Sequence, residues 1–217
     1  MNKRKILILT AALCILATIA IGGTLAYFTD TKTVKNTFTM GDVKILLDET
    51  DVNNPEGPRV TGNKYDVAPG SVVTKDPVVH NVGANKAYIR ATVNVENWMN
   101  TCAAYFPDFG IHYPSAGYEN SLKLLVGELG EGWSIVGVTT GTPFEMGNFS
   151  AKFILKYDGI LNAGEDTTPM FNKVTVPAGI TNDNKLGDIT VKAEAIQTDN
   201  FADWDAAFAA FDGQPNP

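Results

Sequence analysis

Residues that could carry out chemistry are few in this chain and lie far apart in the sequence. There are two histidines and two cysteines among 217 residues. His80 and His112 are 32 positions apart, and neither has an Asp or Glu at metal-ligand spacing beside it. The HExxH pattern, which places two zinc-binding histidines on one face of a helix, is absent. We therefore expect both histidines to be structural and no metal to be bound.

The sequence supports nucleophilic catalysis no better than it supports a metal site. Cys102 stands in an apolar segment, where no basic residue would lower the pKa of its thiol, so a Cys102–His112 pair is disfavoured. The GxSxG elbow and the phosphate-binding GxxxxGK[ST] loop are both absent. We predict that the chain is not an enzyme and needs no cofactor. We expect Cys102 to be buried; the alternative is pairing between two chains.

Two acidic turns could bind calcium, which prefers oxygen ligands on loops. They are Asp48-Glu49-Thr50-Asp51-Val52-Asn53 and Asn182-Asp183-Asn184, and neither has the EF-hand spacing. Such clusters are more often simply solvated. We expect solvated acidic loops and keep calcium binding as the alternative.

Composition places the chain among folded proteins. Hydrophobic residues make up 44% and charged residues 19%, which suffices for a packed core. The net charge of −7 argues against nucleic-acid binding, because such surfaces are built from Lys and Arg. Two cysteines exclude a disulfide framework.

The N-terminus has the layout of a secretory signal peptide. Lys3-Arg4-Lys5 is positive, residues 6–21 are uncharged and mostly apolar, and Thr24-Leu25-Ala26 has small side chains at its first and third positions. We predict that residues 1–26 are removed by cleavage between Ala26 and Tyr27. An uncleaved anchor is the alternative, although the apolar run is shorter than the ~20 residues of a typical membrane span.

The predicted mature chain begins with a segment that favours an extended strand. Residues 27–38 are rich in Thr and aromatic residues, which favour strands over helices. Phe28, Val34 and Phe38 share one parity, so an extended chain would present them on one face.

The remaining chain predicts a mainly β fold. Residues 88–95 place Ile89, Ala91, Val93 and Val95 on one face of a half-buried strand, and residues 189–196 alternate in the same way. Further strands are expected at 43–47, 71–82, 122–126, 133–139, 153–157 and 174–176, with a loop at 49–70 and a connection containing a short helix at 97–120. This pattern predicts an antiparallel, jelly-roll-like sandwich that forms a single domain over residues 27–217.

The C-terminal segment predicts a short helix. Phe201, Trp204, Phe208 and Phe211 recur at intervals of three and four and form one apolar stripe. Asn200 is the expected N-cap. We expect this helix to dock on the sandwich; an exposed binding helix is the alternative.

Several motifs, taken in order, resemble the TasA/camelysin family of exported proteins of Gram-positive bacteria. The match is best at both ends and in the first half. The motifs are Gly22-Gly23-Thr24-Leu25-Ala26-Tyr27-Phe28-Thr29-Asp30-Thr31, Asn36-Thr37-Phe38-Thr39-Met40-Gly41, Pro69-Gly70, Lys75-Asp76-Pro77-Val78-Val79-His80-Asn81-Val82-Gly83, Ala87-Tyr88-Ile89-Arg90 and Ala193-Glu194-Ala195-Ile196-Gln197.

The resemblance implies a jelly-roll-like fold, cleavage of the leader by a SipW-type signal peptidase, and a role as a secreted protein of the biofilm matrix or cell surface. Fibre-forming members assemble by donor-strand exchange, in which the strand freed by cleavage completes a neighbour's sheet. Phe28, Val34 and Phe38 are the donor-strand candidates here. Camelysin relatives are described as metallopeptidases, but this sequence lacks a recognisable zinc triad, so we do not carry that activity over.

Three functions remain to be compared. The favoured one is a structural protein that self-associates into filaments, with other matrix proteins as possible partners and no membrane contact after cleavage. The second is a monomeric exported binding or accessory protein whose loops 49–70 and 97–120 carry the site. The third is a secreted metallopeptidase.

Overall fold

A computed structural model describes residues 43–105, 118–140, 150–181 and 186–214. All of them belong to one compact unit spanning Thr37–Gln214. The predicted signal peptide, the junction Ala26–Tyr27 and His112 lie outside the described residues, as do the donor-strand candidates Phe28, Val34 and Phe38. They remain predictions.

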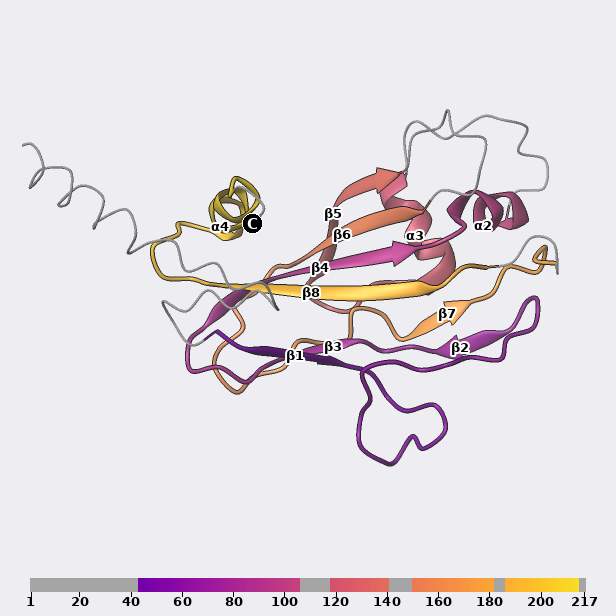
Figure 1. The fold of residues 1–217 in the computed structure, drawn as a ribbon, viewed down its shortest axis with the longest axis horizontal. Helices are drawn as coiled ribbons and strands as arrows, with labels where there is room; N and C mark the ends of the chain where they lie inside the picture. Colours follow the sequence, from indigo (N-terminus) through magenta and orange to yellow (C-terminus); the bar gives the residue numbers. More distant parts are fainter. Residues whose placement is uncertain (1–42, 106–117, 141–149, 182–185, 215–217) are drawn as a thin grey trace, which may run out of the picture. The chain divides into compact units, whose positions relative to one another are not determined.

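The largest element is a four-stranded antiparallel sheet (Figure 1). Its strands follow the order β5 (Trp133–Thr140), β6 (Ala151–Tyr157), β4 (Ala87–Val95) and β8 (Ile189–Gln197). β4 is bonded on both sides, to β6 and to β8. Every second residue of β4 is buried, the longest such alternation among the described strands.

One face of this sheet forms the main core. Ile89, Ala91, Val93 and Val95 of β4 are all fully buried, which confirms the predicted face of this strand. Val93 lies between Phe153 of β6 and Val191 of β8. The ring of Phe153 meets Trp98 edge to face, with centroids 5.1 Å apart. Cross-strand packing of this kind is the main source of stability in a sheet.

Two short sheets lie on one side of the four-stranded sheet (Figure 1). β1 (Ile45–Asp48) pairs with β3 (Val78–Asn81), and β2 (Val72–Thr74) pairs with β7 (Lys173–Thr175). Both pairs are antiparallel. The expected mainly β, antiparallel class is therefore confirmed, whereas jelly-roll connectivity stays a prediction.

Two described helices lie between β4 and β5 in the sequence: α2 (Trp98–Tyr105) and α3 (Tyr118–Val126). The prediction of a strand at 122–126 was wrong, because that segment is the second half of α3. Leu122, Leu125 and Val126 are buried at the i, i+3, i+4 spacing of one helix face. Gly127 ends the helix with φ 73° and donates its N–H to the carbonyl of Lys123.

The C-terminal helix α4 (Trp204–Asp212) docks on the other face of the four-stranded sheet, as expected. Trp204 and Phe208 are buried against Ile196, and the indole Nε1 of Trp204 donates to the carbonyl of Ile89 at 2.8 Å. The expected cap was wrong: Asp203 accepts from the N–H of Ala206 at 2.8 Å. Asn200 instead turns the chain with φ 73° before the helix begins.

Arg90 joins this helix to the sheet. Its guanidinium pairs with Glu194 of β8 at 2.8 Å and with Asp212 of α4 at 2.7 Å. It also lies over the ring of Phe208, 4.4 Å from the centroid. Within the described residues, no helix is both long and apolar enough to span a membrane.

Candidate functional site

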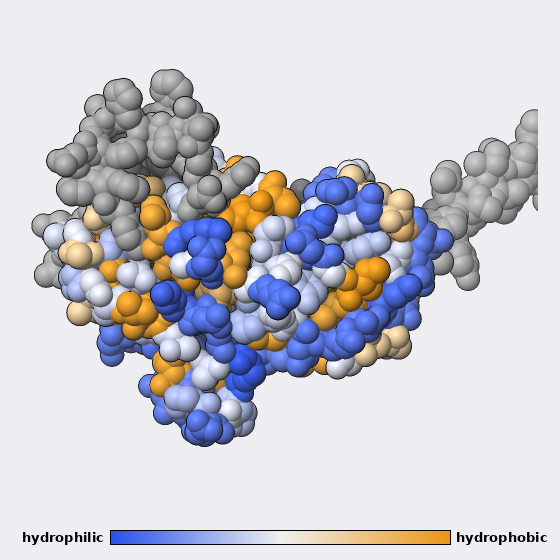
Figure 2. Space-filling model, turned by 180° about the vertical axis from the view of Figure 1, so that it is seen from behind, coloured by the Kyte–Doolittle hydropathy of each residue, from blue (hydrophilic) through white to orange (hydrophobic). Residues whose placement is uncertain are grey.

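A groove of about 580 Å³ lies between β1, the start of β8 and the β2–β7 pair. Its lining combines aliphatic side chains with polar and charged ones, and residues 61–65 and 67 of the loop 49–70 border it. Figure 2 shows apolar surface interrupted by hydrophilic residues above this projecting loop. The apolar lining residues are Leu47, Val67, Val73, Val174, Val176, Leu186, Ile189 and Val191.

Two of the strands that line the groove lie at sheet edges: β1, through Leu47 and Asp48, and β8, through residues 189–191. Among the described strands, β1 pairs only with β3, and β8 pairs only with β4. Each strand therefore has one side without a ladder partner in that part of the chain. A sheet edge beside an apolar groove can accept an added strand, because the backbone bonds to the edge and alternate side chains enter the groove.

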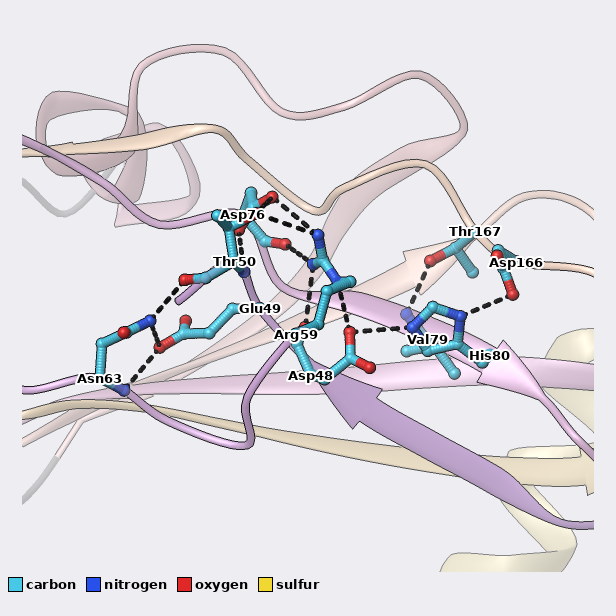
Figure 3. Close-up of polar contacts among 10 residues, drawn as sticks. All are labelled: Asp48, Glu49, Thr50, Arg59, Asn63, Asp76, Val79, His80, Asp166 and Thr167. Carbon is cyan, nitrogen blue, oxygen red and sulfur yellow. Dashed lines mark hydrogen bonds and ion pairs between the residues drawn. The ribbon is translucent and has the colours of Figure 1, made fainter. Parts of the chain in front are cut away.

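The base of the loop 49–70 is fixed by the guanidinium of Arg59 (Figure 3). Its Nε donates to the carboxylate of Asp48 at 2.5 Å, and its Nη1 donates to the carboxylate of Asp76 at 3.0 Å. Nη2 donates to the backbone carbonyl of Asp76 at 2.7 Å. One planar side chain thus joins the end of β1 to the segment between β2 and β3.

Asp76 is further held by Thr50, whose N–H and hydroxyl donate to its two carboxylate oxygens at 2.8 and 2.7 Å. Burial alone would raise the pKa of Asp76, but the hydrogen bonds from Thr50 and Arg59 outweigh it and lower that pKa. Asp76 therefore stays ionised and keeps the cation of Arg59 neutralised.

His80 lies between two carboxylates (Figure 3). Its Nδ1 is 2.6 Å from Asp166 and its Nε2 is 2.9 Å from Asp48. Because an ionised carboxylate only accepts hydrogen bonds, both contacts are satisfied only when both ring nitrogens carry a proton. Burial would lower the pKa of His80, but its bonds to Asp48 and Asp166 raise it above the ordinary value. No local sequence pattern marks these partners, because they are 32 and 86 positions away from His80.

Glu49 forms a second polar cluster on the groove wall. Its side chain is only 5% exposed and bonds to the ammonium of Lys75 at 2.6 Å. Its other oxygen accepts from the side-chain amide of Asn63 at 2.9 Å. Burial, with the charge of Glu49, raises the pKa of nearby Tyr65 to about 12.

These contacts also involve the acidic turn 48–53, for which calcium binding was the alternative prediction. Its first two carboxylates, Asp48 and Glu49, are each paired with a cation, Arg59 and Lys75. Of the three carboxylates in that turn, only Asp51 is without an ion pair to a described residue. The other turn, 182–184, lies outside the described residues.

A zinc site of the kind that a metallopeptidase needs does not fit the described residues. Nowhere in 43–105, 118–140, 150–181 or 186–214 do three His, Cys, Asp or Glu side chains gather as metal ligands. Both nitrogens of His80 already face carboxylates. Cys102 packs at the edge of the core, where burial raises the pKa of its thiol to about 11, so it is a poor ligand and nucleophile.

Comparison with known families identifies the chain. The profile of the camelysin metallo-endopeptidase family matches residues 2–113, more than half of the 217 residues. The chain therefore belongs to this family, which confirms the resemblance noted in its motifs. Comparisons with curated proteins and with solved structures returned no match.

Proposed function

We propose that this chain is an exported structural protein of the biofilm matrix or cell surface, whose copies assemble by donor-strand exchange. The observation that carries the proposal is the groove beside the edge strands β1 and β8, which has aliphatic side chains in its lining. A strand laid there would gain backbone hydrogen bonds at the start of β8, where residues 189–191 line the groove. It would also cover the aliphatic walls of the groove.

The proposed occupant is residues 27–38 of a second copy. This segment favours an extended conformation, and Phe28, Val34 and Phe38 would face the groove together. Its 12 residues are enough to run the whole length of β8. A contact in which one end of a subunit fills a groove elsewhere on the next does not close on itself, so it produces filaments.

The leader would control the timing of this assembly. While residues 1–26 are attached, the donor segment is tethered to the export machinery. A SipW-type signal peptidase would release it by cutting between Ala26 and Tyr27, outside the cytoplasm. The protein would then act in the extracellular matrix or at the cell surface, alone or with other matrix proteins.

We also propose that the chain is not a peptidase, although its family is named for a metallo-endopeptidase. The lack of a fitting ligand set in the described residues supports this. Caseinolysis by the purified protein with added zinc, with and without a chelator, tests it. Chelator-sensitive hydrolysis that co-purifies with the protein would overturn it.

The assembly proposal is tested by removing the donor. We expect the chain processed at Ala26–Tyr27 to form filaments, seen by light scattering and electron microscopy. The same chain without residues 27–38 should stay monomeric, and it should cap growing filaments when added in excess. Monomers of both forms at high concentration would contradict the proposal and favour a monomeric binding protein.

A matched pair of variants tests the groove itself. Val67 borders the groove and is 44% exposed, whereas Ile160 lies outside it and is 45% exposed. A charge at either site is tolerated by the fold because both side chains reach water. We expect Val67→Arg to slow filament growth strongly and Ile160→Arg to leave it unchanged. Equal effects of the two variants would place the donor elsewhere.

A further inference from the structure

Glu49 lies between an amine and an amide. Lys75 donates from Nζ to Oε2 of Glu49 at 2.6 Å, and Asn63 donates from Nδ2 to Oε1 at 2.9 Å. The side chains of Lys75 and Glu49 are 11% and 5% exposed. A nucleophile, an electrophile and a proton carrier therefore meet at one shielded carboxylate, and neither zinc binding nor strand exchange uses this arrangement.

The side-chain amide of Asn63 is held in a defined orientation. Its Oδ1 accepts the N–H of Val52 at 3.0 Å, and its Nδ2 also donates to the carbonyl of Thr50 at 2.7 Å. Glu49 is fixed in turn by two backbone hydrogen bonds with Val60, each 2.8 Å. The ring of Tyr65 lies 5.8 Å from Nζ of Lys75 and covers that side.

We propose that Lys75 and Asn63 become joined by an isopeptide bond, with Glu49 as the proton carrier. Glu49 first takes a proton from the Lys75 ammonium, which leaves a lone pair on Nζ. The flexible stem of Lys75 carries Nζ from one oxygen of Glu49 to the amide held at the other. Nζ bonds to Cγ of Asn63, and the carbonyl electrons move to Oδ1.

The second half of the reaction expels ammonia. Glu49 gives its proton to Nδ2 and takes one from Nζ. The Cγ–Nδ2 bond then breaks, its electron pair leaves with the nitrogen, and the carbonyl forms again. Ammonia takes the last proton from Glu49 and departs as ammonium. An ammonium and a primary amide have become a secondary amide and ammonium ion, so no oxidant, reductant or co-reactant is needed.

The surroundings favour this reaction over hydrolysis. The low exposure of Lys75 and Glu49 limits the access of water to their contact and strengthens the electrostatic interaction between them. The N–H of Val52 points at the oxygen that becomes negative when Nζ attacks, as an oxyanion-hole donor does. Holding amine and amide on one carboxylate removes most of the entropic barrier to their encounter.

The bond would close a covalent ring over residues 63–75. It would tie Asn63, in the second half of the loop 49–70, to the residue that follows β2, on the wall of the groove. Such a link would hold this wall in place without a disulfide, in a chain that has only two cysteines. The inference does not depend on strand exchange, because the bond forms within one chain.

Mass spectrometry of the denatured full chain tests the proposal. We expect a mass lower than that of the sequence by one ammonia molecule. Trypsin should release a branched peptide in which residues 60–64 are joined to residues 65–86, because modified Lys75 is no longer cut. The free peptide 65–75 should be missing. If that free peptide appears at full yield, or if ammonia is lost without the branched peptide, the proposal is wrong.

Two variants assign the roles. Lys75→Arg keeps the positive charge beside Glu49 but supplies no neutral amine, so it should have the full mass. Glu49→Gln cannot carry the proton, so it should also have the full mass while circular dichroism shows a folded protein. A branched peptide in Glu49→Gln would overturn the role of Glu49, and one linked through another lysine in Lys75→Arg would overturn that of Lys75.

Discussion

The four-stranded sheet and the β1–β3 sheet are stabilised in different ways. β4 has nine residues, is paired on both sides and buries a continuous apolar face. β1 and β3 have four residues each. Much of what fixes β1 is a set of ion pairs made by Asp48, Arg59 and His80. The first region is held by the hydrophobic effect and the second by directional charge contacts.

This difference affects which part of the molecule could accept a partner strand. The four-stranded sheet offers a partner only its edge strands, of which β8 borders the groove. The β1–β3 region leaves one side of β1 without a ladder partner among the described strands, and it borders the groove. Under the proposed strand exchange, these polar contacts would hold in place the wall that the donor strand covers.

The largest effect is expected from the core of the four-stranded sheet. Phe153→Ala removes a fully buried ring that packs on Trp98. It should lower the free energy of unfolding by about 3–5 kcal/mol, measured by urea denaturation. The matched control is Val136→Ala on the neighbouring strand, which is 45% exposed and should change stability by less than ~0.5 kcal/mol. Similar losses in both variants would contradict the assignment of the core.

The next largest effect is expected at Arg59. Arg59→Ala leaves the carboxylates of Asp48 and Asp76 without their shared cation. Because the side chain is 31% exposed, we expect a loss of about 2 kcal/mol, within the range for charge-assisted hydrogen bonds. Arg59→Lys keeps the charge but not the planar set of guanidinium donors, so it should recover only part of the lost stability. Full recovery by Lys would show that charge alone matters here.

Much of the first region could be predicted from the sequence. The alternation in β4 and β8 and the stripe of Trp204 and Phe208 follow directly from local periodicity. The strand prediction at 122–126 failed because a short apolar run fits both the two-residue period of a strand and the 3.6-residue period of a helix. Gly127, which ends α3, was the overlooked signal.

The polar region could not be predicted in the same way. Asp166 is 86 positions from His80, and Asp76 is 17 positions from Arg59. No local pattern marks such partners, because the register of separate strands brings them together. The groove was missed for the same reason, since β1, β7 and β8 come from three distant parts of the sequence.

A smaller, pH-dependent effect is expected at His80. Its pKa is raised in the folded protein, so the protonated form favours folding. This stabilisation is complete below the ordinary pKa of 6.5 and is lost as the pH rises through the raised value. Deprotonation removes one of two hydrogen bonds, worth about 1 kcal/mol.

The measurement is the urea midpoint across this pH range for the parent and for His80→Gln. The fall in the parent midpoint should be absent in the variant. His112 is present in both proteins, so its titration cancels in the difference. Parallel pH profiles would show that His80 is not charged between Asp48 and Asp166.

The smallest effect is expected from an ion pair that has an ordinary contact distance but is exposed to solvent. Lys123 and Glu128 are 2.8 Å apart, as close as Arg90 and Glu194, but Glu128 is 85% exposed. Water already solvates both charges, so Glu128→Gln should cost less than ~0.5 kcal/mol by urea denaturation. Glu194→Gln is the matched variant, because Glu194 is only 8% exposed and its loss leaves Arg90 partly unpaired under α4. A larger cost for Glu128→Gln than for Glu194→Gln would mean that contact distance, and not burial, sets the strength of charge contacts in this protein.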